Sequence, residues 1–490
     1  MFDIPTTLNG LALLALHAAV VVIATIYVSA NRRPSAAIAW VLTIIFIPFV
    51  GALVYFTIGA SRLPRARRQK QIEVNSWVLE RVAGLHLTSH SDRWPAWLAS
   101  AVLLNQNLGA LPMVGGNRAS LLPEYEATFA AMVAEIDTAT EYVHVEFFIA
   151  VKDKTTEPFF AALGRASARG VKIRVLSDWL MGRMYPGRKE TRAYLASIGA
   201  EWHAMLPINI FKGQWQRPDM RNHRKLVIVD GRVGFMGSQN LIDSSYNKPG
   251  NIKRGMHWHE LMVRLEGPIV RELEAVFATD WYSETDEILP INEAPIELPA
   301  ETAEHPNLFD AQVLPSGPSF DNDNNLKLYA LLIQNAEKRV SITSPYFVPE
   351  ESTQLAILTA AARGVEVELF VSEIGDQALV YHAQRSYYEP LLAAGVKIWL
   401  YATPTVLHAK HFTIDDDVTI LGSSNMDIRS FSLNMEVSVM IQGAEFVKRM
   451  RVIQDSYRAH SKPVVLAEWV RRPLAQKIRD NLARLTSSLQ

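Results

Sequence analysis

His223-Arg-Lys225-Leu-Val-Ile-Val-Asp230 is the most informative stretch of this 490-residue sequence, and after six further residues it is followed by Gly237-Ser238-Gln-Asn240. The pattern recurs as His408-Ala-Lys410-His-Phe-Thr-Ile-Asp415, with Gly422-Ser423-Ser-Asn425 at the same offset. A single H-x-K-x4-D arises by chance in roughly a few chains per hundred of this length. The longer pattern H-x-K-x4-D-x6-G-S-x-N, present twice, makes chance a negligible explanation.

The first motif predicts a β-hairpin that carries the histidine and the lysine on one face. Residues i and i+2 of a strand share a face, so His223 and Lys225 project together. The apolar run 226–229 then leads into Asp230-Gly231, which we interpret as a two-residue turn. Counting back from that turn places Ser238 opposite His223.

The second motif predicts the same arrangement, with Asp415-Asp416 as the turn and Ser423 opposite His408. Histidine can act as a nucleophile or a proton donor near neutral pH, and lysine and asparagine donate hydrogen bonds to phosphate oxygens. Each motif therefore predicts half of a phosphate site. The candidate residues are His223, Lys225, Ser238, Asn240, His408, Lys410, Ser423 and Asn425. Asp230 and Asp415 fall at the turn ends, where we expect a structural role.

The paired motif resembles the phospholipase D superfamily, in which two half-sites meet on a pseudo-twofold axis. The resemblance implies a two-step phosphatidyl or phosphodiester transfer that needs no metal and no cofactor. One histidine forms a phosphohistidine, and the other protonates the leaving alcohol and then activates the acceptor. The family's usual assignment makes His223 the nucleophile and His408 the acid/base, a choice that the sequence itself does not make. The catalytic set that it implies is His223, Lys225, Asp230, His408, Lys410 and Asp415.

Two carboxylates follow the motifs at matching places, namely Glu260 after the first and Glu436 after the second. A carboxylate on the other ring nitrogen fixes the tautomer of a catalytic histidine and supports its charged form. Family members place acidic residues at such positions, so we expect both glutamates to orient the histidines, with surface salt bridges as the alternative. Asp427 and Arg429 follow the second motif only, and the sequence assigns them no role.

The halves of the chain also share a pattern of helices and strands. Each reads strand, helix, strand, helix and then the motif hairpin, and the string Ala168-Arg-Gly-Val171 recurs as Ala362-Arg-Gly-Val365. This predicts the α/β class, as two duplicated phospholipase D-like domains with mixed sheets that form one pseudo-twofold catalytic unit. The expected domains are a hairpin of two transmembrane helices (1–61), a basic linker with some helix (62–115), domain 1 (116–295) and domain 2 (296–490).

The N-terminus is apolar over two long runs. No Asp, Glu, Lys or Arg occurs in 4–31 or in 34–61, and about 20 apolar residues suffice to cross a bilayer as a helix. We therefore predict transmembrane spans at 8–30 and 36–60. A cleaved signal peptide and a buried pair of core helices are the alternatives.

The charge pattern bears on location and partners. Five basic residues follow the second run between Arg62 and Lys70, against Arg32 and Arg33 between the runs. The positive-inside rule then predicts a multi-pass protein of the cell (inner) membrane with its catalytic domains on the cytoplasmic face. A net charge of −1 argues against a nucleic-acid partner. A homo-oligomer is possible, but the sequence does not indicate one.

Three further patterns have plain alternatives. His257 and His259 have a strand spacing that could hold a metal, but Glu260 is expected to orient a histidine and no other third ligand is clear, so no metal site is predicted. The stretch 321–325 imitates a calcium loop without its later glycine and glutamate, so we interpret it as a helix cap. The segment after Pro473 predicts a basic amphipathic helix, which could lie on an anionic membrane or pack on the domain.

Over nearly the whole chain, from the N-terminal hairpin to Arg472-Pro473, the sequence resembles the bacterial cardiolipin synthases more closely. The segments that carry it are 34–40, 47–51, 265–268, Asp280-Trp281, Ser344–Pro349 and Asn425–Ser430. It implies that two phosphatidylglycerols give cardiolipin and glycerol, so the expected partners are phosphatidylglycerol and cardiolipin in the membrane. Tyr346, Phe347 and Pro349 are expected along the lipid path. The alternatives are a membrane-bound phospholipase D or phosphodiesterase and a noncatalytic anionic-lipid scaffold, and the acceptor alcohol stays open.

Overall fold

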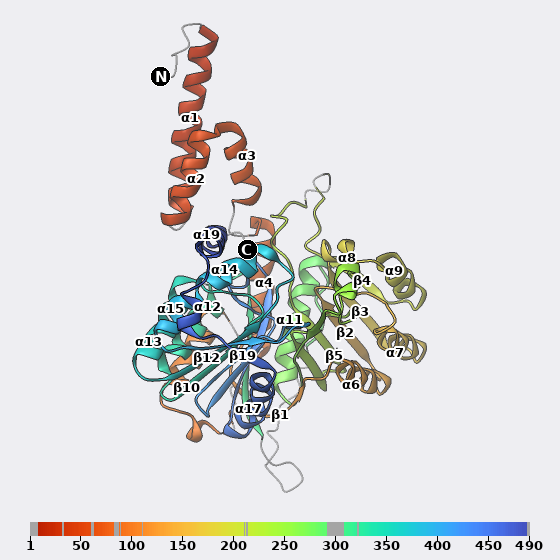
Figure 1. Cartoon of the computed structure of the whole chain (residues 1–490). Helices are drawn as coiled ribbons and strands as arrows, with labels where there is room; N and C mark the ends of the chain where they lie inside the picture. Colours follow the sequence, from red (N-terminus) through yellow and green to blue (C-terminus); the bar gives the residue numbers. More distant parts are fainter. Residues whose placement is uncertain are drawn as a thin grey trace.

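The computed structural model of the chain describes residues 8–31, 34–59, 63–82, 88, 90–109, 111–209, 211, 214–291, 308–320 and 323–487. They form a narrow bundle of helices and a larger α/β body from which the bundle projects (Figure 1). The body holds both motifs. The predicted boundary between residues 295 and 296 lies outside the described residues.

The first half of the body alternates strands and helices as its sequence predicts. Its elements are β1 (Val114–Leu122), α6 (Tyr125–Asp137), β2 (Tyr142–Phe147), α7 (Glu157–Ala168), β3 (Lys172–Asp178), α8 (Met181–Met184), α9 (Arg188–Ser197), β4 (Glu201–Met205), β5 (Lys225–Val229), β6 (Val233–Gly237), α10 (Pro249–Lys253), β7 (His257–His259), β8 (Met262–Glu266) and α11 (Ile269–Thr285).

The second half repeats this order and adds short elements at its end. Its elements are β9 (Phe309–Ser316), α12 (Asn324–Asn335), β10 (Arg339–Thr343), β11 (Phe347–Val348), α13 (Glu351–Ala362), β12 (Glu366–Ser372), α14 (Ala378–Ser386), α15 (Tyr388–Ala393), β13 (Lys397–Tyr401), β14 (Thr405–Leu407), β15 (His411–Ile414), β16 (Val418–Gly422), β17 (Met426–Asp427), α16 (Ile428–Ser432), β18 (Glu436–Gln442), α17 (Ala444–Ala459), β19 (Ser461–Pro463), α18 (Leu466–Trp469) and α19 (Leu474–Arg484).

One continuous sheet joins the two halves. Its order is β19-β13-β12-β10-β15-β16-β18-β9-β1-β8-β6-β5-β2-β3-β4, so outward from the central β9–β1 pair both halves follow the same sequence of strands. The outer strands β2–β3–β4 and β10–β12–β13 pair in parallel, whereas the motif hairpins pair antiparallel. The duplicated α/β fold with a mixed sheet is therefore confirmed.

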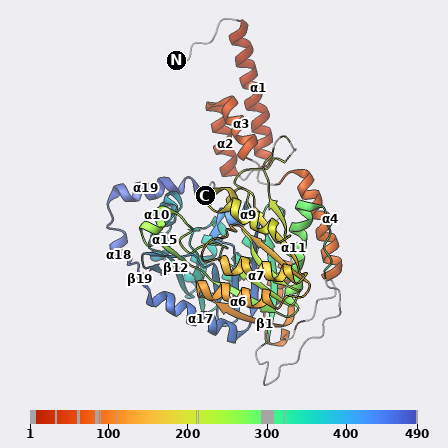
Figure 2. The ribbon, with the colours of Figure 1, turned by 90° about the vertical axis from the view of Figure 1, so that its right-hand side faces the viewer.

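Buried helices cover both faces of this sheet. Helix α11 lies between the halves in Figure 1 and beside α4 in Figure 2, and Leu273, Phe277 and Trp281 on it are fully buried. They belong to a hydrophobic core that also contains Leu226 and Leu421 from the two motif hairpins. Because one core reaches both hairpins, the halves are fixed relative to each other.

The hairpin register differs from the two-residue turns that the sequence suggested. Val229 pairs with Val233 and Ile414 pairs with Val418, so each connection is a three-residue loop. The cause is local, since Asp230 and Asp415 adopt left-handed backbone conformations with φ of 50° and 49°. The register is shifted by one residue, and Ser238 and Ser423 are therefore not opposite the histidines.

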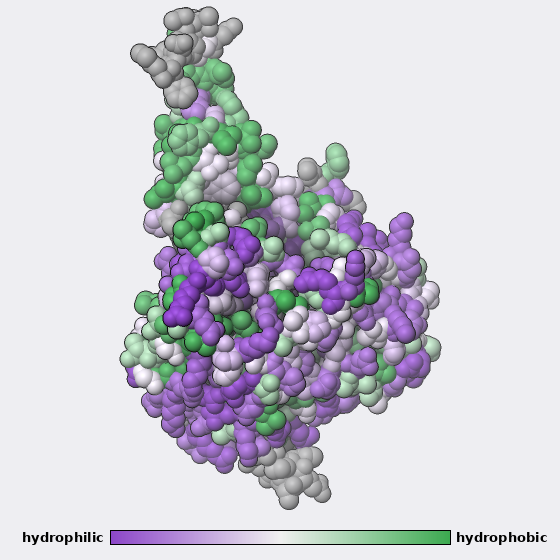
Figure 3. All heavy atoms as spheres, in the orientation of Figure 1, coloured by the Kyte–Doolittle hydropathy of each residue, from purple (hydrophilic) through white to green (hydrophobic). Residues whose placement is uncertain are grey.

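The N-terminal bundle contains α1 (Leu8–Asn31), α2 (Pro34–Phe46) and α3 (Pro48–Ile58). In the described part of the chain, one helix, over Gly10–Ala30, is long and apolar enough to cross a bilayer. Its outward-facing side chains are exposed, for example Ile23 and Ile26 at 66% each. This disfavours the alternative of a buried pair of core helices. Figure 3 shows apolar atoms over this bundle above a largely hydrophilic body.

The second predicted span is not one continuous helix. Pro48 lacks a backbone N–H and its ring crowds the preceding turn, so the helix stops at Phe46 and a new one starts. The two pieces pack closely, since a Cβ on Gly51 would lie 2.9 Å from the Thr43 carbonyl oxygen. Two more helices, α4 (Arg65–Val82) and α5 (Leu98–Asn107), lead to the body.

Candidate active site

Each motif enters the site along a segment of the other half. The His223 N–H donates to the Met435 carbonyl at 2.8 Å, one residue before Glu436. In the second motif, the His408 N–H donates to the His259 carbonyl at 2.7 Å, one residue before Glu260. Strands β14 and β7, which pair in parallel, extend this second contact. The backbone thus brings each histidine beside the glutamate of the opposite half.

The side chains complete this crosswise pairing. His223 Nδ1 lies 3.0 and 2.9 Å from the two carboxylate oxygens of Glu436. His408 Nδ1 lies 2.8 and 2.9 Å from those of Glu260. An Nδ1–H that donates to a carboxylate leaves Nε2 as the nitrogen that can attack or carry a proton. Both glutamates therefore occupy an orienting position, each toward the histidine of the other half.

The motif serines support the glutamates. Ser423 Oγ donates to Glu436 at 2.6 Å, and Ser238 holds the corresponding position beside Glu260. The glycine before each serine lets two strands approach, since a Cβ on Gly237 would meet the Leu261 carbonyl oxygen at 2.3 Å. The Gly-Ser pair of each motif thus helps to hold the carboxylate of the neighbouring glutamate.

The motif lysines are buried at the same place. Lys225 Nζ donates to the carbonyl of His223, and Lys410 Nζ donates to that of His408 at 2.5 Å. The charges of Lys410 and His408 also act on His223, which lies in the other motif. The two motifs therefore form one site rather than two separate ones.

Asn240 and Asn425 are buried beside this centre. Asn240 donates to the Tyr246 hydroxyl at 2.9 Å, and this hydroxyl donates to Glu260 at 3.2 Å. The backbone N–H of Asn425 donates to Ser430 Oγ at 3.2 Å. The first asparagine thus belongs to the network that holds Glu260.

The motif aspartates lie at the far ends of the hairpins. Asp230 accepts hydrogen bonds from the backbone N–H groups of 140–142, and Asp415 accepts them from those of 337–339. A whole strand, β5 or β15, separates each aspartate from its histidine. They fix the start of the neighbouring strand and touch neither imidazole.

The pKa values of both histidines are lowered, that of His223 more than that of His408. Burial lowers the pKa of His223 well below its usual range, and the positive charge of Lys225 lowers it further. Burial also lowers the pKa of His408, but Glu260 opposes that shift. Imidazole is more easily kept charged at His408 than at His223.

The pKa values of the two glutamates shift in opposite directions. Burial raises the pKa of Glu436 to about 7, although Lys225 opposes the shift. Burial would also raise the pKa of Glu260, but His408 and Lys410 outweigh it and hold this pKa below its usual value. The pair in which Glu260 takes part is therefore the more strongly ionised one.

Aromatic rings surround the imidazoles, and the motif pattern did not indicate most of them. Phe148 meets His223 edge-on with ring centroids 4.8 Å apart. Tyr246 and Tyr346 meet His408 at 6.3 and 6.1 Å. Tyr346 was expected along the lipid path, whereas Phe148 has no signal in the sequence beyond its place after a buried strand.

The residues after the second motif have structural partners. Asp427 caps α16 through the Ser430 N–H at 2.6 Å. Arg429 donates to the Asp219 carbonyl at 2.6 Å and to Asn434 at 3.3 Å, and Asn434 in turn donates to Glu436 at 3.3 Å. The described residues contain no group of three or more His, Cys, Asp or Glu that could hold a metal.

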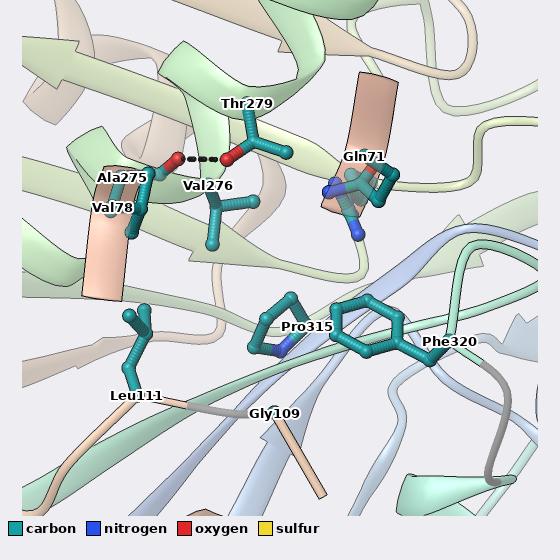
Figure 4. A pocket seen from close by; sticks show the side chains of 10 residues that line it. Gln71, Val78, Gly109, Leu111, Ala275, Val276, Thr279, Pro315 and Phe320 are labelled. Carbon is teal, nitrogen blue, oxygen red and sulfur yellow. Dashed lines mark hydrogen bonds between the residues drawn. The ribbon is translucent and has the colours of Figure 1, made fainter. Parts of the chain in front are cut away.

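A separate pocket lies between α4, α11 and the end of β9 (Figure 4). Its cavity has a volume of about 30 Å³, and Val78, Leu111, Val276 and Phe320 are among its lining residues. Of the motif residues only Arg224 contributes to it. It is therefore not the phosphate site.

Known proteins match nearly the whole chain. The profile "Cardiolipin synthase, PLD-like domain" matches residues 132–281 and 329–457, and "Phospholipase_D-nuclease N-terminal" matches 18–59. Cardiolipin synthase A of Proteus mirabilis (strain HI4320) is 32% identical over 475 residues, which are 95% of each chain. That of Pectobacterium carotovorum subsp. carotovorum (strain PC1) is 30% identical over 468 residues, 94% of each.

A solved structure supports the fold. Phosphatidylserine synthase of Haemophilus influenzae Rd KW20 matches with a TM-score of 0.59 and 15% identity, over 80% of this chain and 100% of that one. Because the PLD-like profile covers more than half of the chain and curated relatives match almost all of it, the chain belongs to the cardiolipin synthase family of the phospholipase D superfamily.

Proposed function

We propose that the chain is a membrane-bound phosphatidyltransferase that converts two phosphatidylglycerols to cardiolipin and glycerol through a phosphohistidine. The observation that carries this proposal is the crosswise pairing of His223 with Glu436 and of His408 with Glu260 in one buried site. Two oriented imidazoles beside two lysines suit phosphoryl chemistry better than a passive lipid-binding surface.

In the first step His223 Nε2 attacks the phosphorus of one phosphatidylglycerol. The bond from phosphorus to the headgroup glycerol oxygen breaks, and His408 Nε2–H gives that oxygen its proton. The low pKa of His223 keeps it neutral and nucleophilic. The charge of Glu260 supports the imidazolium of His408 before it donates.

In the second step the terminal hydroxyl of another phosphatidylglycerol attacks the same phosphorus. His408 Nε2, now neutral, takes the hydroxyl proton, and the bond between phosphorus and His223 Nε2 breaks. Cardiolipin leaves and both imidazoles return to their starting states. A lipid acceptor is favoured over water because the apolar N-terminal helices tether the site close to a bilayer.

Lys225 and Lys410 stabilise the extra negative charge of each pentavalent transition state, and Asn240 and Asn425 are assigned to phosphate binding beside them. Serines 238 and 423 act through the glutamates that they hold. Burial lowers the pKa of Lys410 to about 8, although the charge of Glu260 opposes the shift. A bound phosphate would add a further negative charge that favours the ammonium form.

The apolar N-terminal helices place the protein in a membrane. Within this proposal the protein is multi-pass: α1 forms the first crossing, and α2 and α3 together form the second. The body then lies on the cytoplasmic face. The basic residues Arg65, Arg67, Arg68 and Lys70 after the bundle support that orientation.

The test is product analysis by lipid mass spectrometry after reconstitution in phosphatidylglycerol vesicles. The wild type is expected to form cardiolipin and glycerol in equal amounts, and His408→Ala is expected to form neither at a measurable rate. Phosphatidic acid without cardiolipin would instead identify a hydrolase. Unchanged lipid turnover in His223→Ala would show that the motif is idle.

A further inference from the structure

Helix α19 docks on the body through its charged face. Asp480 is 1% exposed and accepts from His382 Nδ1 at 2.9 Å and from Arg385 Nε at 3.3 Å, both on α14. Arg472 Nη1 donates to the same carboxylate at 2.7 Å. A buried carboxylate with two guanidinium partners and an imidazole beside it is a strong anchor, so α19 has a fixed orientation on α14.

The opposite face of α19 presents apolar side chains to the outside. Leu474, Ile478, Leu482 and Leu485 are 71, 49, 58 and 78% exposed. Their spacing puts them in one stripe along the helix. Such a stripe normally packs on the core, yet here the polar face does so, and the stripe is left for another apolar medium.

Basic residues border this stripe. The segment 471–485 contains five Lys or Arg and one acid, Asp480, whose carboxylate is held in the anchor just described. Arg471 and Arg479 are exposed. An apolar stripe with cationic flanks complements the headgroup and upper acyl region of an anionic bilayer.

The position of α19 fits the same partner. In Figures 1 and 2 it lies on the side of the body from which α1 projects. Its support, α14, follows the carboxyl end of β12, and His408 precedes β15, two strands away at the same edge of the sheet. The stripe therefore lies on the edge where the phosphate site is built.

The first half has exposed apolar side chains at the matching edge. Helix α8 follows the carboxyl end of β3, and Met184 on it is 65% exposed. Phe211, in the connection between β4 and β5, is 103% exposed. In Figure 1, α8 lies on the bundle side of the body. Exposed apolar side chains thus lie on both sides of the paired histidines.

We propose that the outer face of α19, with Met184 and Phe211 across the site, seats the carboxyl edge of the sheet on the anionic bilayer surface, so that phosphatidylglycerol enters the site directly from its own leaflet. This deepens the proposed function and rests on it for the identity of the lipid, while the docking itself can be measured without catalysis.

The chain has no cysteine, so a single introduced thiol carries a fluorophore without further changes. Leu482→Cys is labelled with an environment-sensitive dye and reconstituted as the full chain in phosphatidylcholine–phosphatidylglycerol vesicles that contain a brominated lipid. The matched control is Val452→Cys, at a side chain that is 68% exposed. Val452 belongs to α17, which lies at the end of the body opposite the bundle in Figure 1. Lipid quenching is expected at 482 and not at 452. Equal quenching at the two positions overturns the docking. So does a dye at 482 that is shielded from water without being quenched by the lipid, as in a contact between two copies of the chain.

A kinetic arm tests the consequence for substrate entry. The double variant Ile478→Gln, Leu482→Gln is expected to lose about fivefold or more of the turnover on vesicles, yet to match the wild type on monomeric short-chain phosphatidylglycerol. Val452→Gln is the control for both substrates. An equal loss on both substrates overturns the entry route. A wild type inactive on both overturns the proposed function, and the quenching result still decides the docking.

Discussion

The two histidine–glutamate pairs share a geometry and differ in charge. In both, a histidine Nδ1 meets a carboxylate of the opposite half at 2.8 to 3.0 Å. Yet the pKa of Glu436 is raised to about 7 by burial, whereas that of Glu260 is held below its usual value by His408 and Lys410. The duplication supplies a symmetric frame, and small differences around it make the two histidine–glutamate pairs of this one site unlike. The less ionised pair suits a neutral nucleophile and the more ionised pair suits an acid.

The largest expected effect separates the two histidines by their roles. With a phosphatidyl p-nitrophenyl ester, whose leaving group needs no proton, His408→Ala should release about one equivalent of nitrophenolate and then stall. His223→Ala should release none. Steady-state cardiolipin formation should fall at least about 10³-fold in both. Stopped-flow absorbance measures the burst, and mass spectrometry locates the lipid on the His223 peptide.

The exposed His460→Ala variant is the control for this burst and should behave as the wild type. A burst in His223→Ala together with none in His408→Ala would reverse the two roles. Such a result would also mean that the difference in charge between the pairs does not direct the chemistry.

The next effect distinguishes the two glutamates. Glu260→Gln removes the charge that supports the His408 imidazolium, and kcat should fall by about 10²-fold. Glu436→Gln should cost about tenfold at pH 8. Because the pKa of Glu436 is about 7, wild-type Glu436 becomes neutral as the pH falls below that value and then resembles glutamine. The ratio of wild-type to Glu436→Gln activity should therefore approach one at pH 6. A pH profile of kcat/KM checks this, and a ratio independent of pH contradicts it.

Much of this arrangement was predictable from local patterns. The hairpins and the repeated order of strands and helices follow from spacing within short stretches, whereas the orienting role of Glu260 and Glu436 was expected from the resemblance to the family. The hairpins and the repeated order depend on residues close to one another along the chain.

The remaining features depend on contacts that the sequence does not encode locally. The Glu436 that holds His223 is 213 residues away along the chain, so spacing within one half pointed to no particular partner. The loop length depends on Asp230 adopting a positive φ while its carboxylate binds three N–H groups of another segment. The broken second span shows that Pro48 outweighs hydropathy, which counts apolar residues without regard to the backbone.

The smallest effect concerns the residue that follows each motif lysine, which is a histidine in the second half and a leucine in the first. His411 occupies the position of Leu226 and is fully buried, and neither ring nitrogen has a hydrogen-bond partner among the described residues. Burial lowers its pKa to about 3, whereas an unfolded histidine titrates near ~6.5. Between these values the unfolded chain binds the extra proton, so stability is lost as the pH falls below ~6.5.

Replacing this imidazole by the leucine of the first half should remove that dependence on pH. His411→Leu should stabilise the protein by about 1 kcal/mol at pH 7.5, because an unpartnered polar group leaves the core. The gain should be about 2 kcal/mol larger at pH 5, from 1.4 kcal/mol for each pH unit below ~6.5. Thermal unfolding midpoints of the detergent-solubilised chain at the two pH values measure both, with the exposed His460→Leu as the control. A gain that is equal at both pH values would mean that His411 is protonated in the folded protein, and the second half would then bury one more charge than the first.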